Sequence, residues 1–555
     1  MKQSHLTGRN VSIPLLFLLL LPTAAPAQEE LPLEQEVLVS AVETVRPSPG
    51  LAEDRPAWEA KERPESLVVD EETWKLWKEE ALTRTEALPP DFIVPVDEEP
   101  GAGLAATLTS FPGASWSYLS PSDTNLAKSG LRVLQVVNSQ IRLYNNAGNI
   151  LHGRILADFF GAPDTGFEPF DPHAVFDRLG PNQRFYVAAV QHDYAPPVSA
   201  SIWLAVSRSA NPANLDPASW CIYRINSLRN AGTANVSWSD FPGLGVGADT
   251  LFLTTNQHRF SNRIFTYAIL RAINKATLSN NATACPTLTS RVYQPSTTID
   301  NLNIFTIQPA VHSTAPSSFP GTANPAYAIS AKGSPVGTTY TIFRVRNMTT
   351  ANPTLTSLTI NAASFYAYPP DAPQRGTGAG LIETGETRIL NVSAVGDSLW
   401  AGQSTECTVG PSPNEACVRV FRINLGQNSS GTMTATLAQQ ITFGGGQDRY
   451  FFMPAVAAND AQRTVVVFLR SNDSTFVSSV WTAKAATSSS YPTAIPLTAG
   501  SCTLGYPPAR VGDFLGAQVD PTNGTTFWIT GEHPVYWPPG SQQRCVWATT
   551  VAHVN

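Results

Sequence analysis

The chain has 555 residues, of which 42% are hydrophobic and 14% charged, and its formal net charge is −7 at pH 7. The charge is uneven, because residues 28–100 contain 20 acidic and 7 basic residues while residues 101–555 carry a net +4. No basic stripe interleaved with aromatic residues occurs, so we expect no nucleic-acid partner.

The N-terminus has the order of a secretory signal peptide. Lys2 and Arg9 precede an apolar run at residues 13–21, and small residues follow at 25–27. The run is too short to span a bilayer, and no later stretch reaches about 18 uninterrupted apolar residues. We therefore predict a signal peptide at residues 1–27 and a mature chain without a membrane span, secreted into the periplasm or the extracellular space.

Residues 28–105 are predicted to be a separate acidic, proline-rich leader that is mostly disordered. One short helix is expected near residues 70–83, where three acidic residues suit a helix N-terminus. Trp74, Leu76 and Trp77 lie near one face of that helix. The sequence leaves two roles open for the leader: it docks on the body through its Trp residues, or it is a spacer.

From residue 106 to residue 555 the sequence predicts one all-β domain. Short runs rich in β-branched and aromatic residues recur between Gly, Pro, Asn and Asp, without a long helical period. Examples are residues 131–137, 184–190, 201–206, 250–255 and 464–469. A body this long exceeds an ordinary sandwich, whereas a β-propeller accommodates it by repeating four-stranded blades around an axis.

A loose internal repeat supports the propeller. A polar lead-in segment precedes paired apolar runs six times, and the segments are 59 to 82 residues apart when measured from Asp171, Asp240, Pro309, Asn391, Pro454 and Asp513. Six lead-in segments predict six blades. The strands near residues 131–143 either complete the last blade or form a seventh.

The six cysteines all lie in the mature part of the chain, and their even number suits disulfides in an oxidising compartment. Sequence alone leaves many pairings open. The preferred set is Cys407–Cys417 as a local staple, Cys502–Cys545 near the C-terminus and, by elimination, Cys221–Cys285.

The lead-in segments resemble those of a broad group of secreted bacterial β-propellers that are distantly sialidase-like. The resemblance spans roughly residues 130–550 and rests on three segments: residues 170–177, residues 240–246 with Asp249 and Asn256, and residues 510–521 with 526–532. It implies a fold and says little about activity. The arginine triad and the Tyr/Glu pair of active sialidases find no matching positions here, which argues against sialidase activity.

Polar residues of the lead-in segments are the candidate site, because these segments should converge at one mouth of the central channel. The candidate catalytic residues are Asp171, His173, Asp240, His312, Asp513 and Glu532. The candidate ligand-binding residues are Asp171, His173, Asp240, Gln308, His312, Asn391, Arg449 and Asp513, with Asp177 nearby in the sequence. Such carboxylates are suited to binding a divalent cation, and the cation we predict is calcium. Alternatively, they are suited to acid–base chemistry on a glycan. The simpler alternative is that each carboxylate caps its own turn.

Two functions follow from this site. The first is a monomeric binding module for a glycan or a cell-surface protein, which needs no catalytic constellation. The second is a glycoside hydrolase or polysaccharide lyase that uses carboxylates and His at the same mouth. Closely spaced titratable groups, with the pKa of one carboxylate raised, would favour the enzyme.

Overall fold

The computed structural model describes residues 28–42, 66–96, 105–116, 119–163, 167–296, 298–317, 324–376, 378–409, 414–446, 448–505, 509–537 and 544–555. The predicted signal peptide, residues 1–27, lies outside these ranges. None of the helices in the described ranges is long and apolar enough to cross a membrane.

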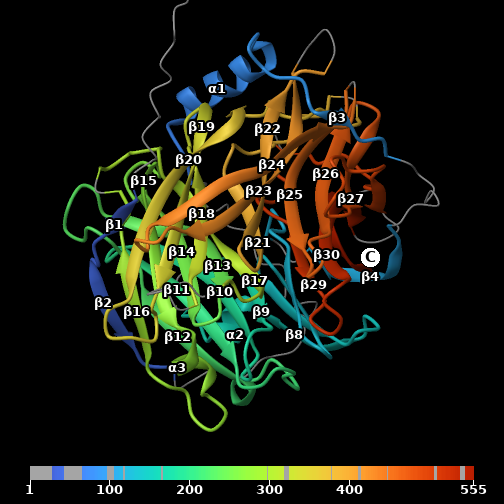
Figure 1. Cartoon of the computed structure of the whole chain (residues 1–555). Coiled ribbons are helices and arrows are strands. Elements are labelled where there is room, and N and C mark those ends of the chain that lie inside the picture. The colour runs from blue at the N-terminus through green and yellow to red at the C-terminus, as the bar shows by residue number, and fades with distance from the viewer. Residues whose placement is uncertain are drawn as a thin grey trace, which may run out of the picture.

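The body consists of seven four-stranded antiparallel units, which we number as blades in chain order (Figure 1). Blade 1 contains β5 (Asn125–Lys128), β6 (Val133–Val137), β7 (Gln140–Tyr144) and β8 (Ile150–Ile155). Blade 2 contains β9 (Phe170–Asp177), β10 (Arg184–Asp193), β11 (Ser199–Ser207) and β12 (Trp220–Asn226). Blade 3 contains β13 (Ser237–Val246), β14 (Thr250–Arg259), β15 (Phe265–Asn274) and β16 (Leu288–Tyr293).

The remaining blades repeat this order. Blade 4 contains β17 (Phe305–Thr314), β18 (Ala326–Ala331), β19 (Val336–Arg346) and β20 (Thr354–Ala367). Blade 5 contains β21 (Ile389–Val395), β22 (Ser398–Cys407), β23 (Glu415–Gln427) and β24 (Met433–Gly444). Blade 6 contains β25 (Tyr450–Ala458), β26 (Thr464–Asn472), β27 (Thr475–Lys484) and β28 (Ile495–Thr498). Blade 7 contains β29 (Gly516–Val519), β30 (Phe527–Trp537), β31 (Arg544–Val554) and, from the start of the body, β4 (Thr107–Ser115).

The protein is thus an all-β propeller with seven blades, the larger of the two predicted counts. The strands near residues 131–143 are β6 and β7 of a separate blade. Blade 7 is completed instead by β4, which pairs with β31 across the chain ends, with Ser115 opposite Ala548. This pairing closes the ring and protects two sheet edges.

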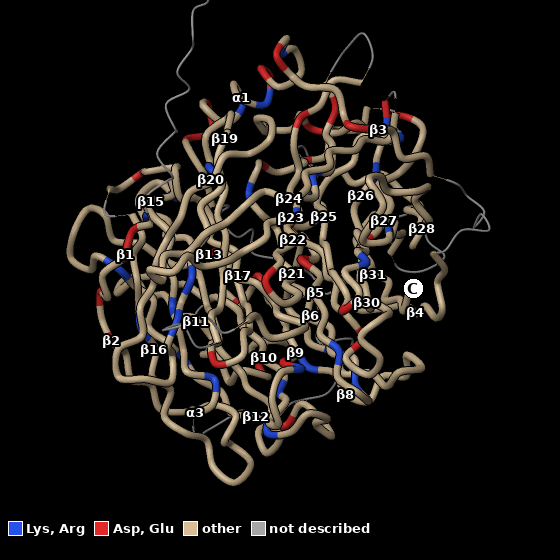
Figure 2. The backbone as a smooth tube through the Cα atoms, viewed as in Figure 1, with Lys and Arg blue, Asp and Glu red and all other residues tan. Residues whose placement is uncertain are grey.

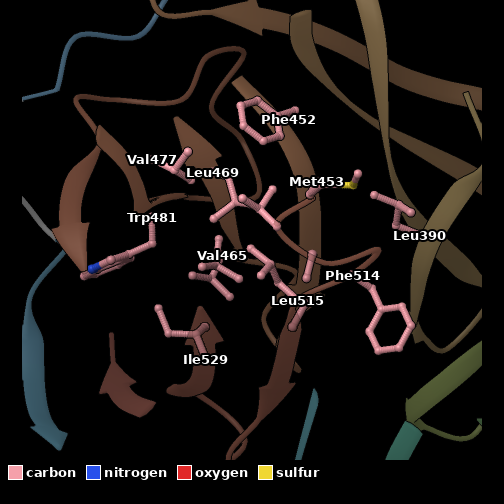
Figure 3. Close-up of a cluster of buried hydrophobic side chains, with 14 of the residues drawn as sticks. Leu390, Phe452, Met453, Val465, Leu469, Val477, Trp481, Phe514, Leu515 and Ile529 are labelled. Carbon is pink, nitrogen blue, oxygen red and sulfur yellow. The ribbon is translucent and has the colours of Figure 1, made fainter. Parts of the chain in front are cut away.

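The hydrophobic core is divided among the contacts between neighbouring blades. Both faces of a blade are covered by its neighbours, so several strands near the channel are buried along their whole length and need no polar alternation. β9, β13, β22 and β25 are buried at every residue. Figure 3 shows the largest cluster, where Val465, Leu469 and Trp481 of blade 6 lie beside Ile529 of blade 7.

The first strand of each blade lines the central channel, and we call it the inner strand: β5, β9, β13, β17, β21, β25 and β29. Two glycines allow blades 3 and 4 to approach closely at their inner strands. A Cβ added at Gly245 would lie 2.4 Å from Cβ of Pro309 and 2.7 Å from the carbonyl oxygen of Ala310. One added at Gly243 would lie 2.6 Å from Cδ of Pro309. Since the carbonyl is backbone and cannot rotate away, any larger residue at 245 would push the two blades apart.

The described part of the leader wraps around the propeller. β1 (Glu29–Leu31) pairs with β20, β2 (Gln35–Val39) with β16, and β3 (Phe92–Ile93) with β24, so three blades gain a fifth strand. The sequence analysis did not predict these strands. Between them, α1 (Glu71–Thr83) lies over the blade 4 and 5 side of the molecule (Figure 1).

The helix α1 docks on the body, which decides between the two roles left open for the leader. Asp70 caps it by accepting a hydrogen bond from the Thr73 N–H at 2.9 Å. The rings of Trp74 and Trp77 lie 5.4 Å and 5.3 Å from that of Tyr368. Leu76 is 52% exposed, so the docked face does not include it.

The three predicted disulfides are confirmed. Cys221–Cys285 joins blades 2 and 3, Cys407–Cys417 staples β22 to β23, and Cys502–Cys545 joins the segment before blade 7 to β31. The other helices are short: α2 (Leu156–Phe160), α3 (Lys275–Ser279) and a 3₁₀ turn (Pro217–Ser219). Charged residues are sparse along the strands (Figure 2).

Candidate functional site

Five of the seven inner strands share a backbone irregularity within or just before their N-terminal half. At this level Asp123, Asp171, Phe241, Thr306 and Met453 all have positive φ, between 44° and 55°. The strand pairing shifts register at the same level in blades 3, 4 and 6. Bulges of this kind turn a side chain out of the strand alternation and are common beside functional sites. We call this end of the channel the mouth.

Three aspartates from three blades meet at the mouth. Carboxylate oxygens of Asp123, Asp171 and Asp513 all lie within 4.8 Å of one another. Asp123 accepts hydrogen bonds from the N–H of Asp513 at 2.7 Å and from the side-chain amide of Asn138. Asp171 accepts one from the N–H of Phe241 at 3.3 Å. The group could hold a divalent cation through carboxylate oxygens, as the calcium prediction requires.

Glu532 lies beside this aspartate group and is almost completely buried, with 2% exposure. It accepts a hydrogen bond from the Ser122 hydroxyl. Burial raises the pKa of Glu532 well above its ordinary value, and the negative charges of Asp123 and Asp513 raise it further. The mouth therefore combines a carboxyl whose pKa is raised with neighbouring aspartates.

Two arginines complete the mouth. Arg510 pairs with Asp513, and its Nε lies 3.5 Å from a carboxylate oxygen of Glu383. The Arg388 guanidinium lies over the ring of Phe241 at 4.2 Å and is paired with Glu386. Guanidinium groups donate hydrogen bonds and carboxylates accept them, so the mouth offers both to a polar ligand.

Two loops cover part of the mouth. The segment between β20 and β21 (368–388) pairs with the segment before β29, through Ile382 opposite Ala509. Both residues belong to the same buried cluster as Phe514 and Met453, whose side chains are labelled in Figure 3. What remains accessible is charged: the side chains of Arg510 and Asp513 are each 26% exposed.

The channel below the mouth is narrow. Its cavity has a volume of about 60 Å³ and is lined by all seven inner strands, including His173, Gln308 and Asn391. Sites for small-molecule ligands usually measure several hundred Å³, whereas this space suits a few water molecules. A ligand the size of a sugar ring therefore does not fit inside the channel.

The candidate residues inside the channel form its walls. The ring of His173 lies 4.0 Å from that of Phe514, and burial lowers its pKa to about 4, so it is neutral. The Asn391 side chain clamps the backbone of Val456, donating to its carbonyl at 2.7 Å and accepting from its N–H at 2.8 Å. Gln308 is 3% exposed.

Three further candidates lie away from the mouth. Asp177, at the other end of β9, forms an ion pair with Lys275 at 2.8 Å, and burial raises its pKa to about 6. His312 is near the same end of β17, and burial lowers its pKa to about 4. Arg449 is in an exposed turn, and within the described ranges no hydrogen bond or ion pair joins it to the mouth carboxylates.

The physical reason for this spread is the length of the inner strands. A strand rises about 3.3 Å per residue, so Asp171 and Asp177 of one lead-in motif are roughly 20 Å apart along the channel. The structure therefore brings together Asp171, Asp240, Asp513 and Glu532 and places the other candidates elsewhere.

Sequence reasoning missed Asp123 and Arg388. Asp123 precedes β5 as Asp171 opens β9, but blade 1 was not recognised as a repeat. Arg388 directly precedes β21 and lies one residue before the lead-in segment as predicted, which begins at residue 389. Treating the residues around β5 as a further lead-in segment would have found Asp123, and starting the segment of blade 5 one residue earlier would have found Arg388.

Comparisons with known proteins give similarity of structure only. No protein-family model matches the chain, and no curated protein matches it by sequence. The α-L-arabinofuranosidase Arb93A from Fusarium graminearum, solved with an iminosugar inhibitor, is 11% identical with a TM-score of 0.31, covering 80% of this chain and 98% of its own. The Cellvibrio cellulosa α-L-arabinanase, solved with arabinohexaose, is 10% identical with a TM-score of 0.27, covering 66% and 92%.

A Trypanosoma rangeli sialidase is also similar, at 8% identity and a TM-score of 0.28, covering 81% of this chain and 60% of its own. A sialidase thus stands among the similar structures, in line with the distantly sialidase-like resemblance of the sequence. Identities and TM-scores this low carry no activity, substrate or site residue over to this chain.

Proposed function

We propose that the protein is a secreted binding module that holds a glycan at the mouth of the propeller. The observation that carries the proposal is that carboxylates from blades 1, 2 and 7 lie close together beside two guanidinium groups. Of these groups, Asp513 and Arg510 are partly accessible to solvent. Three disulfides, which persist in oxidising compartments, support secretion.

The chemistry of this mouth favours a polyhydroxylated ligand. Each sugar hydroxyl both donates and accepts hydrogen bonds, so adjacent hydroxyls can use a carboxylate and a guanidinium together. Asp513 and Arg510 present that combination at the surface. A cell-surface protein is the other partner that the sequence suggests, and it would have to dock on the same charged residues.

The second candidate function is glycan cleavage, and one observation favours it. Glu532 has a strongly raised pKa beside Asp123 and Asp513, which is the pairing of an acid with a carboxylate that hydrolysis needs. Against it, Glu532 is buried at 2% exposure and hydrogen-bonded by Ser122, so it reaches a substrate only if the mouth opens. Binding is therefore the function that this geometry supports best.

A glycan array probed with the mature chain, followed by assay of each retained glycan for released products, tests both functions. Asp513→Asn should weaken retention about tenfold, because it removes a charged acceptor worth roughly 1.4 kcal/mol. Asp460→Asn is the matched control, since Asp460 pairs with Arg178 and its side chain is 37% exposed.

Product release that Glu532→Gln abolishes would replace the binding proposal with the enzyme. Absence of any retained glycan, or equal losses in Asp513→Asn and Asp460→Asn, would refute the mouth as a glycan site.

A further inference from the structure

The leader inserts a buried lysine into a loop of the mouth. Lys78 of α1 is 7% exposed, and its ammonium group meets four oxygens of the segment between β20 and β21. These are the carbonyls of Pro369 at 2.8 Å and Gly385 at 2.6 Å, the Thr384 hydroxyl at 3.0 Å and a carboxylate oxygen of Asp371 at 2.8 Å. A lysine has three N–H donors, so this group is fully satisfied.

The helix presents this lysine on its docked face. Trp74, Trp77, Lys78 and Ala81 follow the three- and four-residue spacing that places side chains on one side of a helix. The two Trp rings contact Tyr368, and Ala81 is completely buried. Lys78 thus occupies a position where an amphipathic helix normally carries an apolar residue.

The C-terminal end of α1 is held just as specifically. The side-chain amide of Asn414 donates to the carbonyls of Ala81 and Arg84, both at 2.9 Å. Arg84 pairs with the buried Glu406 at 3.0 Å. Because the helix is anchored on blade 5 independently of the loop, it can act as a fixed support for the loop.

The loop between β20 and β21 contains two charged residues of the mouth, Glu383 and Arg388. Lys78 contacts both ends of the segment, at 369–371 and at 384–385, and so holds them together. The second contact lies between Glu383, which faces Arg510, and Arg388, which stacks on Phe241. Movement at Gly385 would therefore displace charged groups on both sides of it.

We propose that Lys78 is a positioning residue: it pins the loop 369–388 so that Glu383 and Arg388 are held in place at the mouth. Its effect on a ligand rests on the proposed function, whereas its effect on the loop does not. The leader is then a working part of the site, and a variant that loosens α1 should weaken binding without touching any residue of the mouth.

Hydrogen exchange of the full mature chain, measured by mass spectrometry, tests the loop directly. In Lys78→Met, amides of peptides covering 369–388 should exchange about tenfold faster or more, because removing the ammonium takes the donor from the Gly385 carbonyl. Asp371 and the Pro369 carbonyl are then left with only the 3.4 Å hydrogen bonds from Thr384. Lys75→Met is the matched control, because Lys75 is on the exposed side of the same helix. Asp371→Asn provides a milder second variant in case Lys78→Met fails to fold, and a smaller increase confined to the same peptides is expected.

Unchanged exchange in 369–388, or equal exchange in Lys78→Met and Lys75→Met, would overturn the proposal. The same variants are then applied to the glycan array. Faster exchange together with weaker retention supports both proposals. Faster exchange in a protein whose wild type retains no glycan leaves the support role intact and refutes only the glycan site.

Discussion

Replacing Glu532 by glutamine should stabilise the protein increasingly as the pH rises from acidic values. The folded-state pKa of Glu532 is raised, so the folded chain keeps a proton that the unfolded chain releases. The stability contribution of this carboxyl is complete below the unfolded pKa and is lost as the pH rises towards the folded pKa. Glutamine has the shape of the protonated acid and no such loss.

The magnitude follows from the linkage between protonation and folding. Each pH unit in this window lowers the free energy of unfolding of the wild type by about 1.4 kcal/mol. Between about pH 4.5 and about pH 6.5 the variant should therefore gain stability relative to the wild type, by at most roughly 2.7 kcal/mol. The gain should approach zero below about pH 3.5, where the carboxyl is protonated in both states.

Urea unfolding at both pH values measures this gain. Asp460→Asn is the control, because its ion pair with Arg178 is partly exposed and should contribute less than about 1 kcal/mol at either pH. A Glu532→Gln variant that is less stable than the wild type at about pH 6.5, or a difference independent of pH, would show that Glu532 is ionised in the folded protein. The same result would remove the argument for an acid at the mouth.

Three further predictions concern the fold and the cation. Gly245→Ala should lower the free energy of unfolding by about 2 kcal/mol or more, because the added Cβ forces blades 3 and 4 apart. Gly130→Ala is the control and should be nearly neutral, because its added Cβ contacts only a side-chain atom at 3.9 Å. Equal urea midpoints for the two variants would contradict this prediction. Replacing Cys502 and Cys545 by serine opens a loop with a sequence separation of 43 residues and should remove about 4 kcal/mol, so an unchanged midpoint would argue against this entropic account. If the mouth aspartates hold calcium, EDTA should lower the melting temperature of the wild type but not of Asp171→Asn, and equal sensitivity of the two would refute the calcium prediction.

The fold was largely predictable, and its one ambiguity has a topological cause. Local pattern indicated short strands because β-branched and aromatic runs alternate with turn residues, and these runs did become strands. The number of blades depended on which segment completes the last one. That segment is β4, whose Ser115 pairs with Ala548 more than 400 residues later, and no local pattern records such a partner.

The candidate site was only partly predictable, because a sequence motif does not show where along the channel axis each of its residues lies. Asp171 and Asp177 belong to one motif, yet one is at the mouth and the other pairs with Lys275 at the far end. Arg388 was missed because it lies one residue before the apolar run that marks its segment, at residues 389–395. Lys78 was missed because a lysine on a leader helix is normally exposed.

By itself, the sequence determined the all-β class and the repeated lead-in segments, since both depend on residue type and spacing along the chain. It favoured one disulfide set, which the structure confirms, without excluding the others. The tertiary structure alone decided the seven-blade closure, the meeting of Asp123, Asp171 and Asp513, and the docking of the leader. These features depend on contacts between residues far apart in the chain, and on burial. The raised pKa of Glu532 belongs with them, because it requires the surrounding protein to exclude water.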